Sequence, residues 1–85
     1  MSVWTVPIGI TEITQQYIKD NMPAGTTKVV IPEGVISIGG YAFRNCTSLE
    51  SVKIPNSVES IGGGSFSNCT SLESVVIPEG VKSIG

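Results

Sequence analysis

The stretch Ile54–Val76, IPNSVESIGGGSFSNCTSLESVV, decides the fold because it nearly copies the stretch before it, Ile31–Lys53, IPEGVISIGGYAFRNCTSLESVK. Sixteen of the 23 aligned positions are identical. A third copy opens at Ile77 with IPEGVKSIG and stops at Gly85. A fixed period of this length indicates stacked structural units, because each unit leaves an apolar face that only a neighbouring copy covers. The sequence therefore predicts a solenoid.

The first 30 residues fit the same pattern once a two-residue insertion is allowed. The alignment then places four residues on their equivalents in the second copy: Pro7 on Pro32, Gly9 on Gly34, Ile10 on Val35 and Ile13 on Ile38. We therefore divide this single domain into a diverged first repeat (1–30), two full repeats (31–53 and 54–76) and a truncated repeat (77–85). Because terminal repeats cover an end of the stack and are usually atypical, we interpret residues 1–30 as an N-terminal capping repeat.

This first repeat is predicted to contain a strand and the longest helix of the chain. Trp4 takes the place of Val29, which suggests a strand near residues 3–6, where β-branched and aromatic residues are frequent. Apolar residues recur at helical spacing between Thr11 and Asn21, and Asn21 and Pro23 supply a stop signal. We therefore expect a helix over residues 11–21.

Each later repeat is predicted to begin with a short strand. Apolar residues alternate there with period 2, which is typical of a strand with one buried face. The alternating pairs are Val29 and Ile31, Val52 and Ile54, and Val75 and Ile77. A proline follows each pair and ends the strand, since proline has no N–H for a sheet ladder. We expect these strands to stack as a parallel sheet.

The rest of each repeat is predicted to close one coil. A second extended piece, such as residues 35–38, leads into a glycine pair, and the pairs at 39–40 and 62–63 allow the positive φ angles of a corner. Apolar residues then recur at every third position across 43–49, which favours a helical turn or a 3₁₀ segment with one buried edge.

The string LESVKIPNSVESIGGGSFSNCTSLESVVIPEGVKSIG resembles the BspA-type leucine-rich repeat, also called the Treponema pallidum type, whose 23-residue unit carries IP, SIG, AF and NCTSL at these places. Ser65 departs from the family by replacing the alanine of the AF pair. The resemblance implies an α/β solenoid, namely a short leucine-rich-repeat arc with its parallel β-sheet on the concave face, here with an N-terminal helical cap. It also implies protein binding or adhesion at a cell surface, without enzymatic activity.

The composition argues against several classes of function. A net charge of −2 leaves no basic face for nucleic acid or anionic lipid. The chain has no histidine, and its eleven serines have no partner that could activate them, so we predict no catalytic residues. It shows neither an apolar run of membrane-spanning length nor a secretory signal, so the sequence leaves open a cytoplasmic location or the surface location that the resemblance suggests.

Two pairs of residues are candidates for ligand chemistry. Glu50 and Glu73 stack with like charge in adjacent coils, but no third oxygen ligand shares their column, so we assign no metal and no cofactor. Cys46 and Cys69 occupy the same place in successive coils, within reach of a disulfide. We favour two buried thiols over a bridge, because the side chains are expected to point in parallel toward the core.

Two segments, 45–47 and 68–70, match the acceptor pattern for N-glycosylation. We favour a structural interpretation, in which Asn45 and Asn68 bond to backbone groups that the turn leaves unpaired.

The outward positions of the strand stack are the candidate surface for a protein partner. Their two columns contain Lys28, Val30, Ser51, Lys53, Ser74 and Val76. Two valines in one solvated column suggest a contact, although single exposed apolar residues are common and need no special reason.

The last coil is a second candidate surface. The sequence stops without a helix or polar repeat over this coil, so its apolar residues are expected to be covered on one side only: Leu72, Val75, Ile77, Val81 and Ile84. Full burial stabilises each such side chain by roughly 1.5–3 kcal/mol. We therefore expect this end to pair with a second copy in a homo-oligomer, the two-fold arrangement being the commonest.

Two functions fit these observations. The first is a non-enzymatic protein–protein interaction module, adhesive or surface-associated, that also self-associates through its last coil. The second is a purely structural self-assembling unit, or a fragment of a longer leucine-rich-repeat array.

Overall fold

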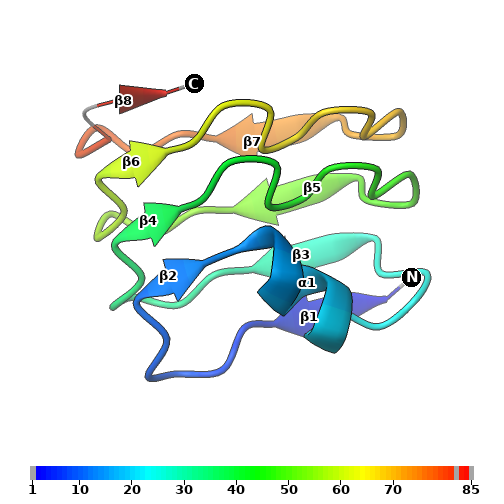
Figure 1. The fold of residues 1–85 in the computed structure, drawn as a ribbon, viewed down its shortest axis with the longest axis horizontal. Helices are drawn as coiled ribbons and strands as arrows, with labels where there is room; N and C mark the ends of the chain where they lie inside the picture. The colour runs from blue at the N-terminus through cyan, green and yellow to red at the C-terminus, as the bar shows by residue number, and fades with distance from the viewer. Residues whose placement is uncertain (1, 82, 85) are drawn as a thin grey trace.

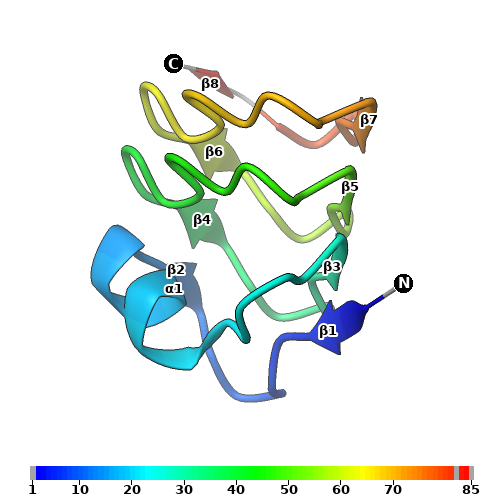
Figure 2. The same ribbon diagram turned by 90° about the vertical axis from the view of Figure 1, so that its right-hand side faces the viewer.

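The computed structural model describes residues 2–81 and the backbone of residues 83–84. The chain winds into a stack of coils, and each coil adds one strand to each of two parallel sheets (Figures 1 and 2). The first sheet contains β1 (Val3–Thr5), β3 (Lys28–Val30), β5 (Ser51–Lys53) and β7 (Ser74–Val76). The second sheet contains β2 (Glu12–Ile13), β4 (Ser37–Ile38), β6 (Ser60–Ile61) and β8 (Ser83–Ile84).

The register of the first sheet follows the sequence repeat. Val29 lies opposite Val52, and Val52 lies opposite Val75, so each partner is one 23-residue repeat further along the chain. Trp4 lies opposite Val29, as the alignment with its two-residue insertion predicts. The predicted solenoid with a parallel sheet is confirmed.

The hydrophobic core runs along the stack between the two sheets. Val29 and Val52 of the first sheet are buried in the same cluster as Ile38 of the second. Phe43 and Phe66 occupy the same place in successive repeats, and their rings therefore stack with centroids 5.4 Å apart.

The helix α1 (Gln15–Asn21) begins later than the predicted range 11–21. The earlier residues pair with the second sheet instead, and Ile13 lies opposite Ile38. Thr14 then caps the helix, because its hydroxyl oxygen accepts a hydrogen bond from the N–H of Tyr17 at 3.1 Å. Ile13 fits both the helical and the strand pattern, and the pairing with the next coil decides between them.

In the first coil, α1 occupies the side of the stack where later coils have turns (Figure 2). Its Ile18 is buried, and the ring of Tyr17 stacks on that of Trp4 with centroids 6.4 Å apart. Both rings pack against the core, in which Val6 and Ile13 are completely buried.

The corners after β4 and β6 differ from the prediction in one respect. Their left-handed residues are Tyr41, with a φ of 59°, and Gly64, with a φ of 67°, so the positive φ angles predicted for the glycine pairs 39–40 and 62–63 are wrong. Position 62 requires glycine for a reason other than its φ angle. A Cβ atom there would overlap the backbone nitrogen of Gly40 in the neighbouring coil.

The helical turn predicted across residues 43–49 is instead a series of separate tight turns. The N–H of Arg44, for example, donates to the carbonyl of Tyr41 at 3.0 Å. Intervening N–H groups point to the next coil, as where Phe43 donates to the carbonyl of Ser65 at 2.7 Å. Bonds between coils thus take the place of a continuous helical ladder.

Candidate functional site

The predicted partner-binding residues lie on the outer face of the β1-β3-β5-β7 sheet, in the predicted columns. One column pairs Lys28 with Ser51 and Ser51 with Ser74, and the next pairs Val30 with Lys53 and Lys53 with Val76. We call this surface the outer sheet face. Its position follows from strand geometry, because side chains at alternate positions point to opposite faces and the valine between them is directed to the core.

A hollow of about 340 Å³ lies over the outer sheet face. Five of the six predicted residues line it, together with Val52 and Ile54: Lys28, Ser51, Lys53, Ser74 and Val76. Val30 does not line the hollow and is half-buried. The structure thus brings together most of the predicted set.

The hollow combines positive charge, hydroxyl groups and one strongly exposed apolar side chain. Lys28 and Lys53 are exposed, and Val76 is 71% exposed. Among the described residues that line the hollow, none is acidic. The surface can therefore form ion pairs and hydrogen bonds with a carboxylate while it covers an apolar group of the same partner.

The apolar residues of the last coil are less covered than their equivalents in earlier coils. Ile77 is 40% exposed, whereas Ile54 is 6% and Ile31 is 3% exposed. The other described members of the predicted set are half-buried, namely Leu72, Val75 and Val81. The backbone of Ile84 pairs with that of Ile61, but the predicted role of its side chain lies outside the described residues.

A second hollow, of about 270 Å³, opens at this end of the stack. Four of its lining residues are large and apolar, namely Ile61, Phe66, Val75 and Ile77. Of these four, Ile61 is buried, whereas Ile77 is 40% exposed, so the hollow presents apolar surface at this end.

Cys46 and Cys69 are free thiols, as predicted, but they are half-buried rather than buried. The Cys69 thiol donates to the carbonyl of Phe43 at 2.9 Å. Burial raises the pKa of Cys46 to about 11, and the neighbouring Cys69 adds to this shift. Burial also raises the pKa of Cys69. Both groups are therefore protonated at neutral pH, which suits a structural role and not that of a nucleophile.

Asn45 and Asn68 make a different contact from the predicted one. The side-chain amide of Asn68 donates to the Oδ1 atom of Asn45 at 2.9 Å, so the two residues bond to each other across the coils. Both also have a positive φ, 64° at Asn45 and 59° at Asn68, which asparagine tolerates better than most residues. Their recurrence at one place in successive repeats is the signal from which this ladder could have been predicted.

Neither a metal cluster nor a membrane span is found in the described part of the chain. Residues 2–81 contain no group of three or more His, Cys, Asp or Glu side chains placed to hold a metal ion. Within the described residues, no helix reaches the length and apolar character that crossing a bilayer requires.

Two solved structures resemble nearly the whole chain. A leucine rich cell surface protein from Faecalibacterium prausnitzii A2-165 is 28% identical, with a TM-score of 0.77, over 99% of this chain and 25% of its own. A leucine-rich repeat protein from Bacteroides ovatus ATCC 8483 is 34% identical, with a TM-score of 0.75, over 99% of this chain and 24% of its own. The chain therefore spans about a quarter of the length of each. No curated protein matches it.

The repeat itself matches a family described as "BspA type Leucine rich repeat region (6 copies)" over residues 12–85. The match begins in β2 and covers α1 and every later coil. It agrees with the resemblance carried by the IP, SIG and NCTSL segments and with the coil geometry of the two solved structures. The chain therefore belongs to the family of BspA-type leucine-rich repeats.

Proposed function

We propose that the chain is a non-enzymatic protein-interaction module that binds a protein partner through its outer sheet face. The observation that supports this most is the hollow of about 340 Å³, in which Lys28, Lys53 and the exposed Val76 lie together. Charged side chains that flank an exposed apolar group suit recognition of another protein, since they add specificity to apolar contact.

The same proposal includes a surface-associated, adhesive role. The solved structure from Faecalibacterium prausnitzii is named a leucine rich cell surface protein, and its coils resemble those of this chain. Adhesion needs a binding face that is displayed and not buried, and the outer sheet face meets that requirement.

The test is a charge reversal, Lys53→Glu, assayed against peptides selected from a random library for binding to the unmodified 85-residue chain. The variant should bind the selected peptides at least tenfold more weakly, a loss of about 1.4 kcal/mol in binding free energy, because it places a negative charge at the centre of the face. Titration calorimetry or fluorescence anisotropy measures the loss.

Lys19→Glu is the matched control, because it reverses an exposed charge on α1, away from this face. It should leave peptide affinity within about twofold. Selected peptides that bind Lys53→Glu as well as they bind the unmodified chain would place the interaction surface elsewhere.

A second candidate function is self-association through the last coil. The increase in exposure from Ile54 to Ile77 and the apolar hollow beside Phe66 favour it. We propose that a second copy of this chain covers the last coil. The alternative is that a further coil of a longer repeat array covers it, in keeping with the greater length of the two solved structures. Sedimentation at micromolar concentration separates the two, because a strict monomer would exclude pairing of copies.

A further inference from the structure

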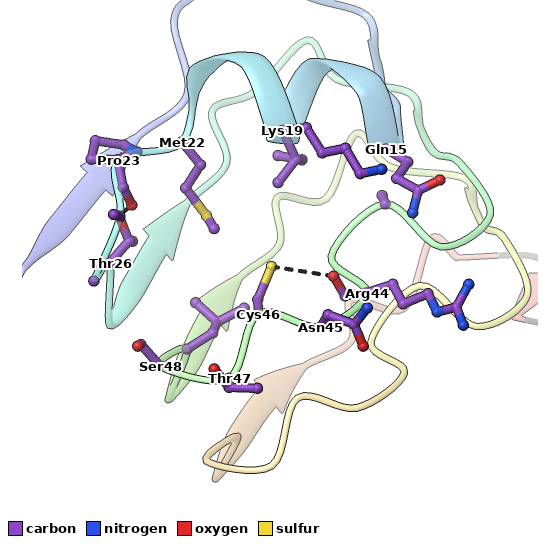
Figure 3. Close-up of a pocket in the computed structure, with 15 residues that line it drawn as sticks. Gln15, Lys19, Met22, Pro23, Thr26, Arg44, Asn45, Cys46, Thr47 and Ser48 are labelled. Atoms are coloured by element: carbon purple, nitrogen blue, oxygen red, sulfur yellow. Dashed lines mark hydrogen bonds between the residues drawn. The ribbon is translucent and has the colours of Figure 1, made fainter.

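A cavity of about 280 Å³ lies between α1 and the turns of the next coil (Figure 3). Its lining residues come from two segments, 15–26 and 42–49. The predicted surfaces do not include this cavity, and neither the interaction proposal nor the self-association proposal uses it.

The cavity is a consequence of placing a helix where the later coils have turns. Adjacent turn segments bond directly through their backbones, as where Phe43 donates to Ser65 at 2.7 Å and Asn45 donates to Ser67 at 2.8 Å. A helix with its side chains is about 10–12 Å wide, whereas neighbouring strands lie about 4.8 Å apart. Because α1 cannot stack at the strand spacing, a space remains between it and the turns.

One side of this cavity is polar and positively charged. Figure 3 shows the polar ends of Gln15 and Lys19 on α1 and of Arg44 and Asn45 on the facing turn gathered toward the same side. Among the described lining residues none is acidic, in a chain with seven acidic and five basic residues. Two cations from separate elements thus share a space that contains no carboxylate of its own.

Arg44 is held in a geometry that leaves its donors available. Its guanidinium carbon lies over the ring of Tyr41, 5.3 Å from the centroid. A cation over a ring face is attracted by the ring without using a hydrogen-bond donor, so the N–H groups stay available for a planar acceptor such as a carboxylate.

The other side of the cavity is apolar. Ile18, Ala42 and Leu49 are buried there, and Met22 is half-buried. Figure 3 places Met22 and Pro23 away from the charged ends of Lys19 and Arg44. A ligand that matches both sides has a carboxylate at one end and an apolar body at the other.

We propose that this cavity binds a small organic carboxylate, with its charged group between Lys19 and Arg44 and its apolar body against Ile18 and Met22. The volume of about 280 Å³ lies just below the usual range of drug-sized pockets, roughly 300–1,000 Å³, and therefore suits a compact molecule. Phenylacetate is a probe of this class, and phenylacetamide is its uncharged analogue of nearly the same shape.

The test is a titration of the isotopically labelled 85-residue chain with each probe, followed by two-dimensional NMR. Phenylacetate should produce saturable shifts concentrated in residues 15–26 and 42–49, with a dissociation constant on the order of 1 mM. Phenylacetamide should bind at least tenfold more weakly. Lys19→Gln and Arg44→Gln should each weaken the binding of phenylacetate by about three- to tenfold, because each removes one charged partner of the carboxylate.

Glu59→Gln is the control, since it removes one exposed charge at a residue that lines neither this cavity nor the hollow over the outer sheet face. It should leave phenylacetate binding unchanged. The proposal is overturned if phenylacetamide binds equally well, if the shifts do not saturate or lie outside the two segments, or if Glu59→Gln weakens binding as much as Lys19→Gln. Spectra of the variants that otherwise match the unmodified chain establish that each variant is folded.

Discussion

At Gly62, the backbone of one coil touches that of its neighbour. A Cβ there would overlap the backbone nitrogen of Gly40 and lie 2.8 Å from its Cα, whereas a Cβ at Gly63 would meet nothing within 4 Å. Gly62→Ala should therefore lower the free energy of unfolding by roughly 1–3 kcal/mol, as measured by urea denaturation. Gly63→Ala is the matched control and should have much less effect, and equal losses in the two variants would contradict this account.

The thiol of Cys46 permits a second test at the residue scale. Its pKa is raised from 9.0 to about 11, first by burial and then by Cys69, so its thiolate fraction at pH 8 is small. Alkylation by iodoacetamide at pH 8 should be roughly a hundredfold slower in the folded chain than in the urea-unfolded chain. The difference between the alkylation rates of the folded and unfolded chains should decrease as the pH rises toward 11. A pH-independent ratio of the two rates would show that restricted access, and not the pKa, protects the thiol.

The short helix α1 depends on its N-terminal cap. The Thr14 hydroxyl oxygen satisfies the N–H of Tyr17, one of the donors that the first helical turn leaves free. Thr14→Ala should reduce the free energy of unfolding by about 1 kcal/mol, and Thr14→Ser, which keeps the oxygen, should lose much less. Thermal unfolding followed by circular dichroism measures both, and an unchanged midpoint in Thr14→Ala would show that the cap is dispensable.

The strands could be predicted from sequence because their pattern is local and is repeated. Val29 and Val52 have the same neighbours and the same alternation, so each copy supports the assignment of the other. The start of α1 could not be predicted in this way, because Ile13 fits two periodicities and only its pairing with Ile38 decides. The left-handed backbone of Tyr41 was not predicted for another reason: glycine is the residue that most often adopts a positive φ, and a glycine pair directly precedes Tyr41.

The candidate surfaces could be predicted to different degrees. The columns through Ser51 and Lys53 follow from the repeat register alone, and the structure places them as predicted. The cavity beside α1 depends on how a helix packs against turns, which a pattern along one chain does not contain. Lys19 and Arg44 are 25 residues apart in the sequence, and no motif links them.

Across the whole molecule, equivalent core isoleucines are more exposed in the last coil than in earlier ones. Ile31 and Ile54 are buried, and the equivalent Ile77 is exposed. If copies pair at this end, Ile77→Glu should shift the sedimentation profile from dimer to monomer, because a charge would be buried in an apolar contact. Lys53→Glu should leave the assembly unchanged. Assembly that persists in Ile77→Glu would place any interface between copies elsewhere.

The bonds between coils are interchangeable from one level to the next. The N–H of Glu50 donates to the carbonyl of Thr27 at 2.7 Å, and that of Glu73 donates to the carbonyl of Glu50 at 2.8 Å. Deleting or duplicating 23 residues in frame would therefore restore every such bond with a new partner of the same kind. Recombination within a gene of this design can lengthen or shorten the protein in whole coils, and natural variation in length is expected to occur in steps of one repeat.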